Sequence, residues 1–198
     1  MAKFDNPYVN EHVPRMGNAV TRWIAETILK LIGWKVTGAF PPEKKIVFIG
    51  APHTSNWDLL LALSAMQAIG LRCSWMMKKS AFIWPVGGLF KKLGGVPIDQ
   101  SAKNNVISQM ADWFAAQHKA YLGLTPEGTR SKVEAFKTGY LRIAYAAKVP
   151  VFLVAVDAEN KEVRLDRLWP LTGDIDIDNQ DIKAYYDSHY KGIRPHLG

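Results

Sequence analysis

Short, continuous apolar runs alternate with longer segments of helical periodicity between residues 44 and 157, and this alternation constrains the fold most strongly. The predicted strands are KKIVFIGAPH, LRCSWMMKK, GVPID, AYLGLTPEG and VFLVAVD. The predicted helices are NWDLLLALSAMQAIG, SAKNNVISQMADWFAAQHK and GYLRIAYAAKVP. Because FIWPVGGLFKKLGG contains Pro85 and two glycine pairs, we expect an irregular or mobile loop there. The pattern predicts a single-domain α/β sandwich with a mixed, largely parallel sheet flanked by helices.

A further amphipathic helix is predicted near the N-terminus, where apolar residues recur at helical spacing between residues 13 and 34. Its apolar side includes Trp23, and its opposite side carries cations such as Arg22. Such a helix either packs on its own domain or lies in a membrane interface, with its cations towards anionic headgroups. We assign residues 1–36 to this N-terminal helical segment, as part of the same domain as the α/β body of residues 37–198.

The chain carries a net charge of +7 and has a pI near 9.4, which favours partners that carry phosphate. Nucleic acid, anionic lipid and a phosphorylated cofactor all meet this condition. Nucleic acid is disfavoured, because no basic stripe is interleaved with aromatic residues outside the helix and strand patterns. Cys73 is the single cysteine and cannot form an internal disulfide, and the sequence contains neither a signal peptide nor about 18 consecutive apolar residues. We therefore expect a cytoplasmic protein.

The stretch APHTSNWD, residues 51–58, ends the first predicted strand and begins the first predicted helix. Five helical residues turn through about 500°, so His53 must precede the helix if Asp58 is to reach it. With Ser55 or Asn56 as the N-cap, the Asp58 carboxylate can contact one ring nitrogen and leave the other as a proton acceptor. This arrangement is suited to general-base catalysis. The spacing from Ser55 to Asp58 also fits a capping box with no catalytic role.

A second polar cluster, TPEGTR, follows the fourth apolar run and presents Glu127, Thr129 and Arg130 at its end. Arg130 can hold a phosphate through two parallel hydrogen bonds, although a lone arginine in a turn is also a common surface feature. Both polar clusters fall where predicted strands end and helices begin. In open α/β sheets, ligands bind at this edge.

The sequence contains no obvious protein nucleophile to accompany the histidine. There is no G-x-S-x-G elbow, and the five histidines lack the close spacing of zinc ligands. Neither a Walker loop nor a dinucleotide fingerprint is present. A base without a protein nucleophile indicates direct attack by a substrate hydroxyl or by water. We expect no tightly bound cofactor and no metal.

The segments HTSNWD, GGVPIDQS, TPEGTRS and VPVFLVAV, in this order, resemble the glycerolipid acyltransferase family typified by 1-acylglycerol-3-phosphate acyltransferases. The resemblance covers about residues 45–156, and the motifs H-x4-D and P-E-G-T-R are specific as a pair at this separation. It implies an α/β fold, membrane association, and transfer of a fatty acyl group from coenzyme A or acyl carrier protein to a lipid hydroxyl. It also implies that residues 37–198 form an acyltransferase domain.

Carried over position by position, the resemblance makes His53 the general base and Asp58 its partner. The element that binds the acceptor then comprises Glu127, Gly128, Thr129 and Arg130. The family's second motif usually ends in an arginine that holds the acceptor phosphate, but Gln100 stands at that place here. Glutamine donates hydrogen bonds but carries no charge. Nearby lysines either supply that charge or are solvated surface residues; they are Lys78, Lys79, Lys91, Lys92 and Lys103.

We therefore predict an acyltransferase that uses acyl-CoA or acyl carrier protein as co-substrate and a lysophospholipid such as 1-acylglycerol-3-phosphate as acceptor. His53 deprotonates the acceptor hydroxyl, which attacks the thioester directly, so that no covalent enzyme intermediate forms. The alternatives are an acyl-thioester hydrolase, an acyltransferase with a non-phosphate lipid acceptor, and a non-enzymatic binding module. We also expect peripheral contact with the cytoplasmic face of a membrane through residues 14–35.

Overall fold

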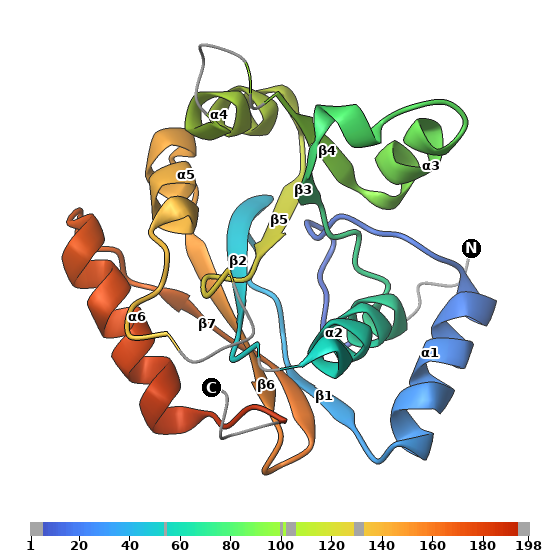
Figure 1. Ribbon diagram of the computed structural model, residues 1–198. Coiled ribbons are helices and arrows are strands. Elements are labelled where there is room, and N and C mark those ends of the chain that lie inside the picture. The colour runs from blue at the N-terminus through green and yellow to red at the C-terminus, as the bar shows by residue number, and fades with distance from the viewer. Residues whose placement is uncertain (1–5, 54, 100, 102–105, 129–132, 194–198) are drawn as a thin grey trace.

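A five-stranded sheet forms the centre of the computed structural model, in the order β1-β7-β6-β2-β5 (Figure 1). Its strands are β1 (Lys35–Gly38), β2 (Lys45–Ala51), β5 (Ala120–Leu124), β6 (Val151–Asp157) and β7 (Glu162–Trp169). Neighbouring strands are parallel, except that β6 and β7 are antiparallel. The predicted mixed, largely parallel sheet is confirmed. The structure describes residues 6–53, 55–99, 101, 106–128 and 133–193.

A second, two-stranded parallel sheet extends the edge of the first. It consists of β3 (Trp75–Lys78) and β4 (Gly95–Ile98). Ser74 connects it to β5, because the Ser74 N–H donates to the Tyr121 carbonyl at 2.8 Å and the Gly123 N–H donates to the Ser74 carbonyl at 2.9 Å. The strand predicted across LRCSWMMKK is therefore shorter than expected and belongs to this small sheet.

Helices cover both faces of the main sheet, as Figure 1 shows. On one face lie α1 (Ala19–Leu31) and α2 (Asn56–Ile69), and on the other lie α4 (Val106–Ala116), α5 (Gly139–Ala147) and α6 (Ile175–His189). Each face has its own cluster of buried apolar residues. The predicted α/β sandwich is confirmed, with an N-terminal amphipathic helix as expected.

The central strand β2 shows why the strand sequences are continuously apolar. Ile46 and Phe48 point into the core under α1 and α2, whereas Val47 and Ile49 point into the core under α4 to α6. Successive side chains of a strand alternate between faces, so a strand covered on both sides requires an apolar residue at every position. The same reasoning applies to β6, whose residues from Val151 to Val156 are all apolar and buried.

The expectation of an irregular or mobile loop in FIWPVGGLFKKLGG is wrong. Residues Val86–Leu93 form a helix, α3, which follows Pro85 and ends at Gly94. Proline is compatible with a helix start, because the first turn needs no intrahelical N–H donors. Gly87 is required by packing, since a Cβ there would lie 2.6 Å from the backbone carbonyl carbon and oxygen of Phe82. The glycines therefore permit close packing rather than mobility.

Besides α3, the sequence analysis did not anticipate β1, β7, α6 and a short 3₁₀ helix, η1 (Lys79–Ala81). The N-terminal helix is also shorter than residues 13–34, because Asn18 caps its first turn and Arg15 forms a β-bridge to Leu71. Among the described residues, no helix has the length and apolar character needed to cross a bilayer.

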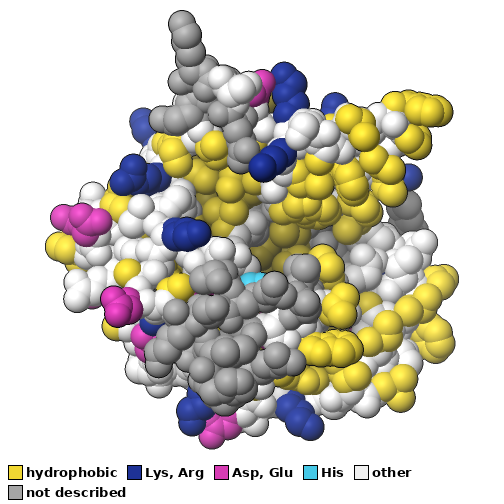
Figure 2. All heavy atoms as spheres, in the orientation of Figure 1, with side chains coloured by type: hydrophobic (Ala, Val, Ile, Leu, Met, Phe, Trp, Pro, Cys, Tyr) yellow, Lys and Arg dark blue, Asp and Glu magenta, His cyan; other side chains and the backbone are white. Residues whose placement is uncertain are grey.

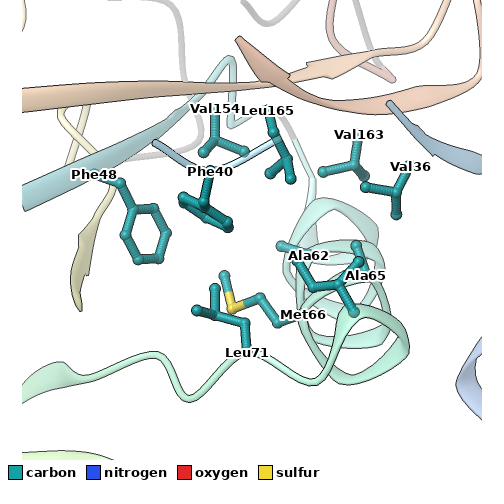
Figure 3. A pocket seen from close by; sticks show the side chains of 11 residues that line it. Val36, Phe40, Phe48, Ala62, Ala65, Met66, Leu71, Val154, Val163 and Leu165 are labelled. Carbon is teal, nitrogen blue, oxygen red and sulfur yellow. The ribbon is translucent and has the colours of Figure 1, made fainter. Parts of the chain in front are cut away.

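A small cavity of about 20 Å³ lies between α2 and the sheet (Figure 3). Ala62, Ala65 and Met66 of α2 face Phe48 and Leu165 of the sheet across it. A cavity with such an apolar lining has no partners for the hydrogen bonds of a water molecule. Around this cavity, apolar packing holds α2, whose N-terminus carries the predicted base and its partner, against the sheet.

Candidate active site

The two predicted polar clusters meet at one edge of the sheet, because the strands that precede them are neighbours. β2 and β5 are parallel and pair in register from Lys45 with Ala120 to Ile49 with Leu124. Their carboxyl ends therefore lie side by side. His53 follows the end of β2, Glu127 follows the end of β5, and the His53 backbone N–H donates to Glu127 Oε2 at 2.8 Å.

The N-terminus of α2 is closed by a capping box. Ser55 is the N-cap, and its Oγ accepts a hydrogen bond from the Trp57 N–H at 3.0 Å. In return, Asp58 Oδ2 accepts from the Ser55 N–H at 2.6 Å. Asp58 thus stabilises the start of the helix, and this contact fixes where its carboxylate lies.

The same carboxylate oxygen of Asp58 faces the imidazole of His53. His53 Nδ1 lies 3.6 Å from Asp58 Oδ2, which is an ion-pair distance rather than a hydrogen bond. The Asp58 side chain is 2% exposed and the His53 side chain 20% exposed. With Nδ1 towards the carboxylate, Nε2 lies on the other side of the ring. The capping box and the histidine–aspartate pair therefore coexist, and this geometry is suited to a general base.

Glu127 is buried, at 6% exposure, directly behind the backbone of His53. Burial is the main reason that the pKa of its carboxyl group is raised to about 7, and the nearby charge of Asp58 raises it further. The hydrogen bond from the His53 N–H and the charge of Lys183 act in the opposite direction. Glu127 therefore keeps its proton to a higher pH than an ordinary glutamate.

Gly128 completes the turn after Glu127 with a left-handed backbone conformation, φ +63°. A Cβ at this position would lie 2.6 Å from Lys137 Nζ, so the side chain of Lys137 lies across the glycine. The Lys137 N–H also donates to the Pro126 carbonyl at 2.8 Å and closes the loop. The sequence analysis missed Lys137 and Lys183 as neighbours of the site, because no motif or local period links them to the turn.

Three of the predicted acceptor-binding residues, Gln100, Thr129 and Arg130, lie outside the described residues, and so does Lys103. Among the other lysines named above, Lys79 pairs with Asp99 at 3.2 Å, and Lys78, Lys91 and Lys92 are exposed. The roles assigned to all of these residues stay predictions.

Figure 2 shows a hollow lined mainly by hydrophobic side chains, with a histidine at its lower edge and Lys and Arg side chains above it and to its left. Such a surface combines an apolar trough with positive charge. It is chemically suited to a substrate with an acyl chain and an anionic head. Among the described residues, no group of three or more His, Cys, Asp or Glu side chains is placed to hold a metal ion.

Comparisons with known proteins identify the family of this chain. A family model described as Acyltransferase matches residues 33–157. A 1-acyl-sn-glycerol-3-phosphate acyltransferase of Escherichia coli (strain K12) is 28% identical over 174 residues, which cover 82% of this chain and 67% of that protein. A protein of the same name from Salmonella typhimurium matches with the same identity and coverage.

The fold is similar to that of a solved structure. It is the crystal structure of the 1-acyl-sn-glycerophosphate (LPA) acyltransferase, PlsC, from Thermotoga maritima, with a TM-score of 0.58 and 15% sequence identity. The match covers 85% of this chain and 78% of that one. At this level of identity, the likeness concerns the fold.

Proposed function

Because the chain belongs to the acyltransferase family, we propose that it moves a fatty acyl group from a coenzyme A or acyl carrier protein thioester to a lysophospholipid hydroxyl. The proposed acceptor is 1-acylglycerol-3-phosphate, the substrate in the names of its relatives from Escherichia coli and Salmonella typhimurium. The observation that carries the proposal is the pairing of His53 with buried Asp58 just beyond the carboxyl end of β2.

In the proposed mechanism, His53 Nε2 takes the proton of the acceptor hydroxyl as that oxygen attacks the thioester carbonyl carbon. The Asp58 carboxylate stabilises the imidazolium that forms. The tetrahedral intermediate collapses as its carbon–sulfur bond breaks, and the imidazolium returns the proton to the departing thiolate. The products are an ester and a free thiol, and no covalent enzyme intermediate is needed.

The acceptor phosphate needs positive charge close to His53, and Gln100 cannot supply it. Lys137 supports this part of the proposal, because its side chain lies across Gly128, next to the residue that contacts the His53 backbone. Arg130, two residues further along the chain from Gly128, is the second proposed phosphate ligand. Lysine and arginine side chains both form strong charge-assisted hydrogen bonds to phosphate oxygens.

We further propose peripheral contact with the cytoplasmic face of a membrane through residues 14–35. The support is the orientation of α1, which buries Ala25 and Leu29 against the core and leaves its larger apolar side chains exposed. Those exposed side chains are Val20, Trp23, Ile24, Ile28 and Leu31, and the C-cap residue Ile32 is exposed as well. An apolar helix face outside the core, with cations nearby, is typical of an interfacial helix.

Acyl transfer by the purified protein tests the proposed function. Labelled palmitoyl-CoA and palmitoyl acyl carrier protein are offered with a panel of lysophospholipids in detergent micelles. His53→Ala is compared with His118→Ala, which changes an exposed histidine outside the site. We expect product with 1-acylglycerol-3-phosphate, a fall of about 10³-fold or more in His53→Ala, and an unchanged rate in His118→Ala.

The same assay distinguishes the alternatives. Free fatty acid released at an equal rate with and without acceptor would identify a thioester hydrolase. Product with neutral acceptors only would make the acceptor a non-phosphate lipid. A His53→Ala protein with full transfer activity would overturn the assignment of the base.

A further inference from the structure

The apolar side of α3 faces solvent instead of the core. Val86, Leu89 and Leu93 recur at helical spacing and are all exposed. Just before the helix, Ile83 is also exposed, and Trp84 is 93% exposed. We refer to residues 82–93 as the α3 prong. A tryptophan so fully in water, next to an apolar helix face, is unusual unless another apolar phase covers it.

The packing of the α3 prong fixes this outward orientation. Its inner side is made by Gly87 against the Phe82 backbone and by Phe90, whose ring meets the Phe82 ring edge-on at 6.1 Å. A side chain at residue 87 would not fit there. The helix therefore cannot rotate its larger apolar residues inward without losing this close backbone contact.

The chain segment that contains the α3 prong carries cations but no acidic residues. The sequence contains no Asp or Glu from residue 59 to residue 98, and Lys91 and Lys92 lie within α3 itself. Lys79 pairs with Asp99, but no ion pair among the described residues involves Lys78, Lys91 or Lys92. Exposed cations beside an apolar surface complement the anionic headgroups of a bilayer.

The α3 prong lies on the same side of the molecule as the hollow. In Figure 2, hydrophobic side chains gather over α3 at the upper right and over α1 and α2 at the right and lower right, on both sides of the hollow. Trp57 and Leu60 of α2 are also exposed. A flat bilayer that contacts α1 can therefore also meet the α3 prong.

We propose that the α3 prong is a second membrane contact, separate from residues 14–35, and that it inserts Trp84 and Leu89 into the interface of an anionic bilayer. With contacts on both sides, the hollow opens towards the lipid phase that holds the acceptor. This inference rests on the proposed function for its purpose, but the binding it describes can be measured without any activity.

The test is binding of the full-length protein to vesicles of phosphatidylglycerol and phosphatidylcholine, measured by co-sedimentation. Trp84→Asp and Leu89→Asp are compared with Ile177→Asp, because Ile177 on α6 is 50% exposed and Leu89 is 53% exposed. We expect each prong variant to weaken vesicle binding by about tenfold or more. The reason is that the variant loses the favourable transfer of an apolar side chain from water into the bilayer. Ile177→Asp should bind like the wild type.

Two further measurements make the result specific. The double variant Lys91→Gln, Lys92→Gln should reduce the preference for phosphatidylglycerol over phosphatidylcholine. In detergent micelles, Trp84→Asp should keep the wild-type transfer rate, because a micelle delivers the acceptor without a bilayer. Circular dichroism and thermal melting of each variant verify that it is folded.

Vesicle binding by folded prong variants equal to that of the wild type would overturn the proposal. Loss of transfer from acyl carrier protein alone, with vesicle binding intact, would also overturn it and identify the α3 prong as the site for that acidic carrier. Prong-dependent binding by a protein without transfer activity in micelles would instead refute the proposed function and leave the membrane contact standing.

Discussion

One carboxylate oxygen of Asp58 serves both the capping box and the histidine, and substitutions can separate the two roles. Asp58→Asn keeps an oxygen that accepts from the Ser55 N–H but removes the charge near His53. Ser55→Ala removes the capping hydroxyl and keeps that charge. We expect Asp58→Asn to lower the transfer rate by about 10²–10⁴-fold with little change in stability. Ser55→Ala should cost about 1 kcal/mol of stability and retain most of the rate.

Urea unfolding and transfer assays on the two variants check this prediction. If Asp58 acted only through the helix cap, Asp58→Asn would keep the wild-type rate and Ser55→Ala would lose more of it than Asp58→Asn.

Glu127 makes the stability of the protein depend on pH. Its pKa of about 7 in the folded state lies above the ordinary value of 4.5, so the folded state holds the proton more tightly than the unfolded state. The contribution of this group to the free energy of unfolding is therefore largest below about pH 4.5. It declines as the pH rises to about 7 and is then constant.

Glu127→Gln replaces the carboxyl group by a neutral amide and should remove this decline. Urea unfolding of the wild type and of the variant, at about pH 5 and about pH 8, measures the effect. Glu134→Gln, at an exposed glutamate, is the control. We expect the variant to gain stability relative to the wild type at the higher pH, and parallel pH profiles would contradict this assignment.

At the scale of elements, α1 has two sides with different functions. Val9, Val13, Ala25 and Leu29 belong to the core, so removal of residues 1–35 would damage the fold as well as the exposed face. Substitutions on the exposed face are the sharper test. We expect Trp23→Asp and Ile28→Asp to lower binding to anionic vesicles by about tenfold or more each.

Co-sedimentation measures this effect of the α1 variants, and Ile177→Asp again provides the control on an exposed isoleucine. The melting temperatures of the α1 variants should stay close to that of the wild type, because both residues are exposed. Undiminished vesicle binding in both variants would count against membrane contact through residues 14–35.

At the scale of the whole molecule, the N-terminal segment of residues 1–36 is predicted to be part of the same domain as residues 37–198. Leu29 supports this prediction, because it is buried in the cluster that also contains Phe152 of β6. We expect Leu29→Ala to lower the free energy of unfolding by about 2–5 kcal/mol within one cooperative transition. Calorimetry would show a separate early transition if residues 1–36 unfolded independently.

The fold was predictable where local pattern and burial agree. The apolar runs of β2 and β6 indicated strands covered on both faces, and the structure places them side by side at the centre of the sheet. The helix in residues 82–95 was missed, because Pro85 and the glycines carry the same local signal in a loop and in a closely packed helix. β7 was missed because its exposed and buried residues follow no simple period.

The sequence by itself determined the local features of the site. His53 precedes the helix and Asp58 lies in its first turn, because cap chemistry depends only on residues a few positions apart. Their catalytic roles stay predictions. Only the tertiary structure placed Glu127 against the His53 backbone across 74 residues, laid Lys137 over Gly128, and turned the apolar sides of α1 and α3 outward. These contacts depend on strand order, register and helix packing. Because they form between segments that are distant in the sequence, no local sequence pattern indicates them.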